Sequence, residues 1–370
     1  EDGIRDCLLS RGLGDVYKRQ DSLFAEFALP ITDEFDMQLA LRYEDYGAKD
    51  SVDPKIVMRW TPIPALTLRF TGQTTFRAAH PDETSQTRVT ALQYVNQAGA
   101  FKAVDFSGNA NLDPEEATTY NFGFVTDFGT DEWTATLDYY DFEFKNPIIT
   151  ENHQQLVNAF AAGGAASAAV ASQMYGGVNT LPYDAATNNF TAASVGRIAS
   201  NYINGPETLT NGVDLYVQYE TDYANGTITT GMEVNYVAKY DVAAYNKGGV
   251  QIAAAYECVG FFNINNGCRS MPDTKAKAFV NYQTDAHNFY GALNYIGAYT
   301  DRRDNREVTA SNTIDATYTY SWDDAFDISL SVYNLTNEEP PFVGWEMNYD
   351  PYVHSPLGRY FKAGFTYRMQ

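Results

Sequence analysis

The segment 213–236, VDLYVQYETDYANGTITTGMEVNY, decides the fold class of this chain. Apolar and polar residues alternate along its first half, and the alternation resumes along 228–236 after a polar turn at 222–225. One face of the first half carries Val213, Leu215, Val217 and Tyr219, and the opposite face carries Asp214, Tyr216, Gln218 and Glu220. One apolar and one polar face per strand is typical of an antiparallel sheet, and of a membrane barrel with lipid outside and water inside.

The same period of two continues from this segment in both directions. It predicts thirteen strands, at 22–30, 36–46, 54–61, 65–76, 118–128, 132–145, 209–221, 226–240, 274–284, 288–300, 309–321, 326–335 and 357–369. No run approaches the roughly 18–20 apolar residues that a membrane-spanning helix needs. A helical membrane protein is therefore excluded, whereas a membrane barrel is not. The Ala-rich stretch 156–174 predicts one short helix inside a loop.

The connections between these strands alternate in length. Short turns are expected at 32–35, 62–64, 129–131, 222–225, 285–287 and 322–325, and long loops at 77–117, 146–208, 241–273 and 336–356. Tight periplasmic turns and long extracellular loops are typical of outer-membrane barrels, whereas a soluble sandwich has no reason to place its long loops at one end.

Aromatic residues near the predicted strand ends indicate girdles at the two membrane surfaces, although ordinary sheet composition is the alternative. They are Tyr43, Tyr46, Trp60, Trp133, Tyr139, Tyr219, Tyr236, Tyr295, Tyr320 and Trp322.

The predicted fold class is all-β, a transmembrane antiparallel β-barrel. An odd set of strands would leave two unpaired edges in lipid, where no water satisfies their N–H and C=O groups. We therefore expect further strands upstream. Thirteen strands of which the first descends from outside fit the C-terminal part of a barrel of about 22 strands, the size associated with plugged transporters. We do not expect the plug domain within the chain.

Residues 1–20, EDGIRDCLLSRGLGDVYKRQ, differ from the rest of the sequence. They show no strand alternation, and they lack the apolar core and small-residue cleavage site of a signal peptide. The tail SRGLGDVYKRQ resembles translated read-through of a sequencing adapter. We predict that 1–20 is a non-native leader and that 21–370 is barrel.

Charge and cysteine content narrow the partners and the compartment. The net charge of -22 repels phosphate, so nucleic acid is not expected as a partner. Cys258 and Cys268 lie close together with no histidine nearby, whereas Cys7 stands apart. The pair predicts a disulfide formed in an oxidising compartment, with two free thiols as the alternative.

Catalytic chemistry finds little support in the sequence. The histidines His80, His153, His287 and His354 lie far apart, without the spacing of metal ligands. Neither a G-x-S-x-G nucleophile motif nor a phosphate-binding loop occurs. Paired carboxylates such as Glu115 and Glu116 are typical of solvated turns. We expect no enzyme, no cofactor and no metal site.

Several segments resemble the C-terminal barrel of TonB-dependent receptors. They are TFRA at 75–78, in the place of the family's GFRAP; GNANLDPE at 108–115, similar to GNPNLKPE; NGVDL at 211–215, similar to SGVDL; VYNL at 332–335 with prolines at 340–341, similar to NLFDKEPP; and GRYF at 358–361, similar to GRYFYLGL. They occur in the family's order and cover nearly everything after Asp21. The chain departs from the family at its end, YRMQ, where an aromatic residue is usual.

The resemblance implies an outer-membrane location and a set of partners. These are TonB with its inner-membrane energising complex, contacted through an N-terminal part not seen here, outer-membrane lipid with lipopolysaccharide, and a small solute. In the family, external loops and the upper surface of the plug capture the solute.

Two groups of side chains are candidates for function. The polar faces of the strands predict lumen-facing residues that contact a plug or solute, or serve as solvated wall: Arg42, Arg59, Arg69, Glu220, Glu233 and Asp315. The loops supply candidate substrate contacts, for which a plain rim charge is the alternative at the arginine pair: Arg77, His80, Asn109, Asn111, Arg302 and Arg303.

The function that follows is uptake rather than chemistry. The resemblance implies a receptor that binds a scarce solute (a ferric siderophore, cobalamin or an oligosaccharide) and passes it through a plugged barrel with energy from TonB. A passive porin-like barrel is the first alternative, and a secreted all-β carbohydrate-active enzyme is the second.

Overall fold

The computed structural model describes residues 20–47, 49–128, 132–177, 181–262, 268–322, 325–345 and 347–368. The predicted leader apart from Gln20, the predicted turn at 129–131, and residues 323–324 of the turn at 322–325 lie outside the described residues.

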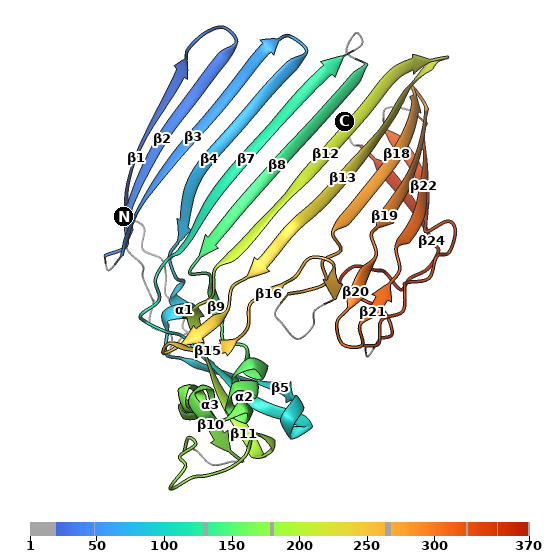
Figure 1. Cartoon of the computed structure of the whole chain (residues 1–370). Coiled ribbons are helices and arrows are strands. Elements are labelled where there is room, and N and C mark those ends of the chain that lie inside the picture. The colour runs from blue at the N-terminus through green and yellow to red at the C-terminus, as the bar shows by residue number, and fades with distance from the viewer. Residues whose placement is uncertain are drawn as a thin grey trace, which may run out of the picture.

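One large antiparallel sheet dominates the described chain (Figure 1). Thirteen strands follow one another in it, each paired with its neighbours in sequence order once the loop strands are set aside. They are β1 (Asp21–Pro30), β2 (Phe35–Asp45), β3 (Asp50–Ile63), β4 (Leu66–Arg77), β7 (Glu115–Phe128), β8 (Trp133–Lys145), β12 (Thr208–Tyr223), β13 (Gly226–Val242), β18 (Thr274–Thr284), β19 (His287–Ile296), β22 (Ser311–Ser321), β23 (Phe326–Tyr333) and β24 (Tyr360–Tyr367). Each of these matches one predicted strand.

The boundaries differ most where a strand leaves the sheet for a loop. The strand predicted at 288–300 ends at Ile296, whose partner Ser311 is the first residue of β22. Residues beyond it pair elsewhere, because Tyr299–Asp301 forms a separate short strand with Arg306–Val308. The period of two continues through both strands, so alternation alone does not show where the pairing partner changes.

The pairing register sorts the side chains of the sheet onto two faces. One row of directly paired residues crosses eight neighbouring strands and is polar except for one glycine: Asp36, Arg59, Arg69, Gly123, Asp138, Asp214, Asn235 and Lys275. The opposite face carries exposed apolar residues, such as Phe122, Met232 and Phe361, whose exposed fractions are 50%, 40% and 77%. Among the buried hydrophobic residues of the described chain, only Ala292 belongs to this sheet. The sheet therefore turns its apolar side outward, as a barrel in lipid does.

Aromatic residues mark both borders of the apolar face. At the tight turns, Phe128 stacks on Trp133 with ring centroids 5.8 Å apart, and Trp133 lies 4.7 Å from Tyr219. Toward the loops, Tyr139 and Tyr236 both pair with Val213 on the same face. Two aromatic rows with apolar residues between them are the arrangement of membrane girdles.

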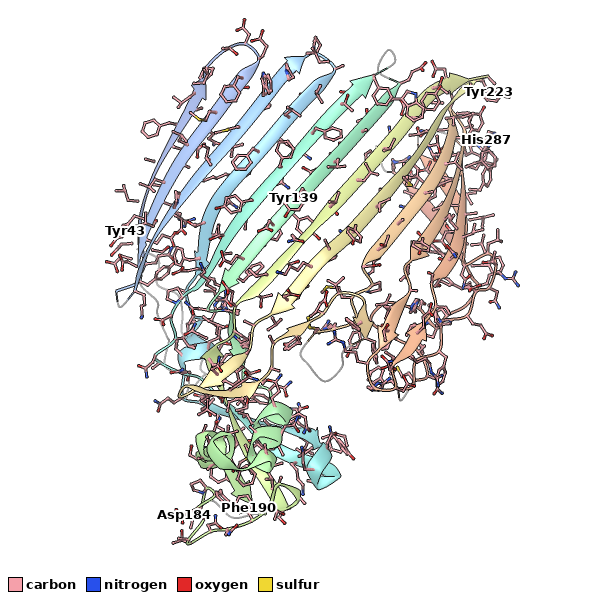
Figure 2. The ribbon with its side chains drawn as sticks, in the orientation of Figure 1. Tyr43, Tyr139, Asp184, Phe190, Tyr223 and His287 are labelled. Atoms are coloured by element: carbon pink, nitrogen blue, oxygen red, sulfur yellow. A yellow bond between two sulfur atoms is a disulfide. The ribbon has the colours of Figure 1, made fainter. Side chains whose placement is uncertain are left out.

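The two ends of the sheet differ sharply. Tyr223 and His287 lie at the end with tight turns, whereas Asp184 and Phe190 lie at the far tip of the longest loop (Figure 2). Tight turns are periplasmic and long loops extracellular in outer-membrane barrels, so the long loops mark the outer side.

Three long loops fold together into a first loop domain, comprising residues 81–107, 148–177, 181–204 and 245–253. Its elements are α1 (Pro81–Thr84), β5 (Arg88–Val95), β6 (Ala100–Ser107), β9 (Ile148–Thr150), α2 (His153–Ala162), α3 (Gly164–Val170), β10 (Met174–Gly176), β11 (Val195–Asn204), β14 (Tyr245–Lys247) and β15 (Val250–Ala253). Its buried core includes Val104, Leu156, Val157, Ile198 and Ile252.

The Ala-rich stretch forms two helices where one was predicted. Asn152 caps α2 by accepting hydrogen bonds from the backbone N–H groups of Gln154 and Gln155. The helix ends at Gly163, which has φ 74° and ψ -171°, and Gly164 follows with φ 61°. Two consecutive residues with positive φ cannot continue an α-helix, and they separate α2 from α3.

A second loop domain lies beside the first and comprises residues 258–262, 268–271, 297–310, 340–345 and 347–354. Its strands are β17 (Phe261–Phe262), β20 (Tyr299–Asp301) and β21 (Arg306–Val308), whereas β16 (Tyr256–Glu257), just before β17, pairs with the end of β13 in the large sheet. Phe262, Tyr299, Val308 and Val343 form its buried core, against which Trp345 packs. No helix among the described residues has the length and apolar character needed to cross a membrane.

Candidate functional site

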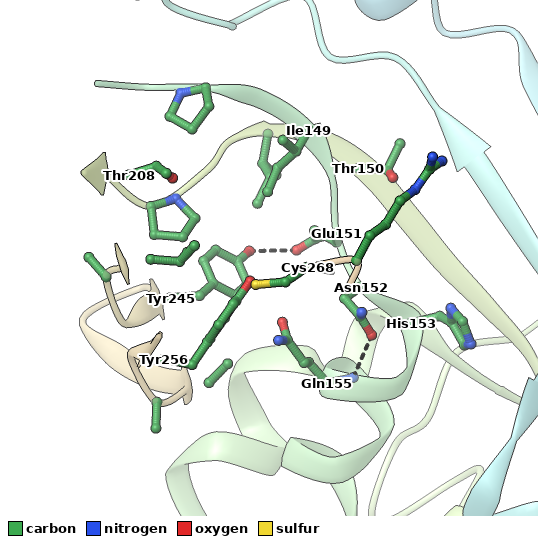
Figure 3. A pocket seen from close by; sticks show the side chains of 18 of the residues that line it. Ile149, Thr150, Glu151, Asn152, His153, Gln155, Thr208, Tyr245, Tyr256 and Cys268 are labelled. Carbon is green, nitrogen blue, oxygen red and sulfur yellow. Dashed lines mark hydrogen bonds between the residues drawn. The ribbon is translucent and has the colours of Figure 1, made fainter. Parts of the chain in front are cut away.

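A cavity of about 680 Å³ lies where the two loop domains meet the outer ends of β12 and β13 (Figure 3). The first loop domain and its connections contribute Gln93, Phe106, Pro147, Ile149, Thr150, Glu151, Asn152, His153, Gln155, Ile203 and Pro206. The sheet and the loop between β13 and β18 contribute Thr208, Tyr240, Val242, Ala243, Tyr245, Ala253, Ala254, Tyr256, Cys268, Arg269 and Met271.

The register places this cavity on the polar side of the sheet. Thr208 shares its face with Asp214 in β12, and it pairs with Val242 of β13. Tyr240 lies on the same face through its pairing with Thr210. The cavity is therefore on the polar face of the sheet, at the end that carries the long loops.

A buried ionic cluster fixes the side of the cavity formed by the first loop domain. The side chain of Glu151 is fully buried, and its Oε1 lies 2.6 Å from Lys247 Nζ. The Tyr245 hydroxyl donates to the same oxygen at 2.7 Å (Figure 3), and Gln173 Nε2 donates to Oε2 at 2.5 Å. Burial and the neighbouring Glu151 carboxylate raise the pKa of Tyr245 well above its usual value, so its hydroxyl stays protonated. These bonds tie the hairpin of β14 and β15 to the loop between β8 and β12.

Of the titratable residues that line the cavity in the described part of the chain, all but one are neutral or neutralised by a partner. Glu151 is neutralised by Lys247, and burial lowers the pKa of His153, which keeps this imidazole neutral at pH 7. Arg269 is exposed and forms no ion pair with any carboxylate in the described part of the chain. Among the described residues that line the cavity, Arg269 alone therefore carries an uncompensated charge.

Aromatic rings support Arg269 from the second loop domain. Its guanidinium lies 5.4 Å from the ring centroid of Tyr352, within the range of a cation–π contact. Tyr352 stacks on Trp345 at 6.2 Å, and Trp345 lies 6.1 Å from the buried ring of Phe262. The adjacent Cys268 is joined to the buried Cys258 by a disulfide, with Cα atoms 5.9 Å apart.

The predicted loop contacts near 77–111 occur together at the base of the first loop domain. Arg77 forms ion pairs with Glu83, at 2.9 Å, and with Glu115. His80 precedes α1 as its cap, and its backbone N–H donates to Glu83 at 2.6 Å. The Arg77 side chain and the His80 backbone hold the loop on the end of β4, and contact of these residues with a substrate remains a prediction.

Asn109 and Asn111 also form hydrogen bonds within the loops. The Asn109 amide donates to the carbonyl of Tyr202 at 3.2 Å, and the Asn109 side-chain oxygen accepts from the N–H of Asn111 at 2.9 Å. Neither residue lines the cavity.

The predicted arginine pair lies apart from this group, on the hairpin of β20 and β21. Arg303 forms a two-pronged ion pair with the buried Asp301, at 2.7 and 3.0 Å. Burial raises the pKa of Asp301, but its hydrogen bonds from Arg303 outweigh that effect, so the pKa is lowered overall. Arg302 instead lies 3.5 Å from the ring centroid of Phe261. Only Arg302 of the pair keeps an unneutralised charge among the described residues.

The six predicted lumen residues share one face of the sheet by register, but they do not form one cluster. Arg59 pairs with Asp36 at 2.7 Å, and Arg69 pairs with Asp138. Arg42 pairs with Glu44, Glu220 accepts from Thr229 at 3.2 Å, Asp315 accepts from Asn294 at 2.9 Å, and Glu233 lies opposite Lys277. Their contact with a plug or a solute remains a prediction.

Sequence reasoning missed the residues that build the cavity. Glu151 and Lys247 are 96 positions apart, and no local pattern joins them. Arg269 had a usable signal, because it directly follows a cysteine that was predicted to be in a disulfide. The described residues contain no group of three His, Cys, Asp or Glu side chains able to hold a metal ion.

Comparison with known proteins identifies the family to which this barrel sheet belongs. A family model described as the β-barrel of TonB-dependent receptors matches residues 9–335. The chain belongs to this family. Its large sheet is the C-terminal part of a TonB-dependent receptor barrel, and its location is the bacterial outer membrane. The match begins inside the predicted leader, whose non-native origin remains a prediction.

Solved structures of TonB-dependent receptors share the fold. A mutant of the ferric enterobactin receptor PfeA from Pseudomonas aeruginosa, in complex with enterobactin, has a TM-score of 0.64 and 14% identity over 94% of this chain and 45% of that one. The siderophore receptor PirA from Acinetobacter baumannii has a TM-score of 0.61 and 16% identity over the same shares of the two chains. The FrpB iron transporter from Neisseria meningitidis has a TM-score of 0.55 and 12% identity, also over 94% and 45%.

This TonB-dependent receptor chain spans less than half the length of those structures. A search of curated proteins finds no match. The family and these structural neighbours are transport receptors.

Proposed function

We propose that the chain is part of a receptor that binds an iron chelate outside the cell and takes it up with energy supplied through TonB. The observation that carries the proposal is the cavity at the outer mouth of the polar face, in a chain of the TonB-dependent receptor family. Its volume lies within the roughly 300–1,000 Å³ typical of small-molecule sites.

An iron chelate is favoured over cobalamin or an oligosaccharide by what the structural neighbours bind or transport. PfeA and PirA are named as siderophore receptors and FrpB as an iron transporter. The proposal therefore names an iron chelate as the solute to be tested first.

A deletion strain tests the proposal under iron limitation. Growth should require the gene when a ferric siderophore is the sole iron source, and it should also require TonB. Uptake that depends on the gene but not on TonB would indicate a passive barrel. Growth that depends on the gene only with cobalamin or an oligosaccharide would identify another solute. Hydrolytic activity of a water-soluble product would support the carbohydrate-active enzyme instead.

Two neighbouring alanines provide a matched test of the cavity. Ala254 lines the cavity, whereas Ala255 faces a separate open groove with Glu207 and Lys239. Ala254→Trp should abolish growth on the chelate by filling the site, and Ala255→Trp should leave growth unchanged. Equal growth of the two variants would move the binding site away from this cavity.

A further inference from the structure

The cavity combines apolar walls with a single charge. Its walls include Phe106, Ile149, Ile203, Val242 and Met271, and the tyrosines Tyr240, Tyr245 and Tyr256 add aromatic surface. Arg269 lines the same cavity and has no carboxylate partner among the described residues. A cation beside apolar walls is worth more to an anion than the same cation in open water, because the local dielectric constant is lower.

The Cys258–Cys268 disulfide restricts the position of Arg269. Cys258 is fully buried, and its N–H donates to the carbonyl of Tyr240 in β13 at 2.9 Å. The bond to Cys268 therefore anchors the residue before Arg269 to the wall of the sheet. After Arg269, the next anchor is Met271, whose N–H donates to the carbonyl of Phe261 at 3.1 Å.

Without the disulfide, only the Met271 side would hold Arg269. The exposed side chain would then rely on the Tyr352 ring, and a single exposed cation–π contact is worth about 0.5–1 kcal/mol, too little to fix a long side chain against its rotamer entropy.

From this geometry we infer that Arg269 selects the charge of the solute, and that the Cys258–Cys268 disulfide is the positioning element that keeps it in the cavity. The ligand class is an organic anion with an aromatic or aliphatic body, which the apolar walls contact while Arg269 pairs with its charge. The inference rests on the proposed function, since it assigns the charge class of the solute at that same cavity.

The inference is tested by measuring the binding of two iron chelates, one anionic and one neutral. The probes are the anionic ferric complex of 2,3-dihydroxybenzoate and a neutral ferric trihydroxamate. Each is titrated into the protein purified from outer membranes in detergent. The wild type should bind the anionic chelate more tightly. Arg269→Gln should weaken its binding about tenfold, the loss of one charge-assisted hydrogen bond. Binding of the neutral chelate should change less than about twofold, because it makes no charge pair. Arg269→Lys should retain most of the preference.

The disulfide is tested in the same assay with Cys258→Ser and Cys268→Ser combined. This variant should lose the anion preference as Arg269→Gln does, and combining all three substitutions should weaken binding no further, since one interaction cannot be lost twice. Heat-modifiable migration on gels checks that each variant has assembled in the outer membrane.

Each contrary result has its own meaning. Unchanged anion binding by Arg269→Gln overturns the role of Arg269 and leaves the proposed function standing. Equal loss of both chelates in the serine variant shows that the disulfide supports the fold rather than Arg269, and overturns the positioning role. Failure of the wild type to bind either chelate overturns the proposed iron uptake, and the inference with it.

Discussion

Val217 and Gln218 are neighbours in β12 whose side chains lie on opposite faces of the sheet. Val217 pairs with Met232 on the apolar face, whereas Gln218 accepts a hydrogen bond from the Tyr216 hydroxyl on the polar face. Substitutions at these two adjacent positions therefore test which face of the sheet contacts lipid.

Arginine at these two positions should have unequal effects. Val217→Arg places a charge against hydrocarbon and should destabilise the folded protein by about 2–4 kcal/mol if the position is near the bilayer midplane. Gln218→Arg should cost well under half as much, because the new charge stays in water. Denaturant unfolding in lipid vesicles measures both. Equal costs would contradict the assignment of the two faces.

The buried Glu151 gives a second prediction at this scale. Glu151→Gln removes the partner of Lys247 and weakens the cluster that joins β14 to the loop between β8 and β12. Breaking a buried ion pair costs about 3–5 kcal/mol, and the lower end applies here because the Lys247 side chain is 30% exposed. Hydrogen exchange of residues 148–176 should accelerate.

The double variant Glu151→Gln with Lys247→Met serves as the control for this prediction. It removes both charges, so exchange should slow again relative to the single variant. Faster exchange in the double variant than in the single one would mean that the charge pair is not what holds the loop.

Burial of His354 gives the second loop domain a dependence on pH. Desolvation lowers the pKa of His354, which lies 3.2 Å from the Tyr299 hydroxyl and near Asp350 and Lys275. The unfolded segment therefore takes up a proton first as the pH falls below about 6.5. Stability that is fully present above that pH is lost as the pH approaches the lowered value.

Hydrogen exchange of residues 347–356 measures this effect. The protection factors, which correct each rate for the intrinsic pH dependence of amide exchange, should decrease between pH 7.5 and pH 5 in the wild type, and His354→Gln should remove most of that decrease. An unchanged pH dependence in the variant would show that other groups, such as His153 in the first loop domain, are responsible.

At the scale of elements, the sequence predicted the strands well and the loops poorly. Alternation is a local signal, and lipid on one side enforces it along each strand, so the large sheet could be counted before its pairing was known. The ends of β19 and β23 were missed because pairing partners, rather than local pattern, decide where those strands stop.

The loop domains could not be predicted for a physical reason. Their cores join segments such as Val104, Ile198 and Ile252, which belong to three different loops. Each segment alone is too short to bury an apolar face, so its own sequence carries no period that reveals the partner. The cavity was equally hard to predict, because its lining residues come from three different loops and from β12 and β13.

Gly163 provides a prediction for the break between α2 and α3. Its backbone conformation is essentially restricted to glycine, and a Cβ atom added there would meet nothing within 4 Å. Gly163→Ala should therefore cost about 1–3 kcal/mol through backbone strain alone. Ala161→Gly, on the exposed face of α2, is the control and should cost about 1 kcal/mol or less. The rate of proteolysis of the loop is measured for both variants. Equal rates would show that a residue other than glycine at position 163 causes no backbone strain.

At the scale of the whole molecule, hydrophobic residues are divided between two environments. The sheet presents its apolar residues outward, while the closed cores lie in the loops outside the membrane. The loops therefore have stability of their own, whereas the sheet depends on lipid for the same hydrophobic contribution.

The connection between β13 and β18 joins the two loop domains physically. Its first part supplies Ile252 to one core, and its later part supplies Phe262 to the other. Between those two points the chain pairs with the end of β13 through Tyr256 and Glu257, and the N–H of Cys258 donates to the carbonyl of Tyr240. One strand of the wall therefore anchors both loop domains, and the position of β13 sets the position of both sides of the cavity.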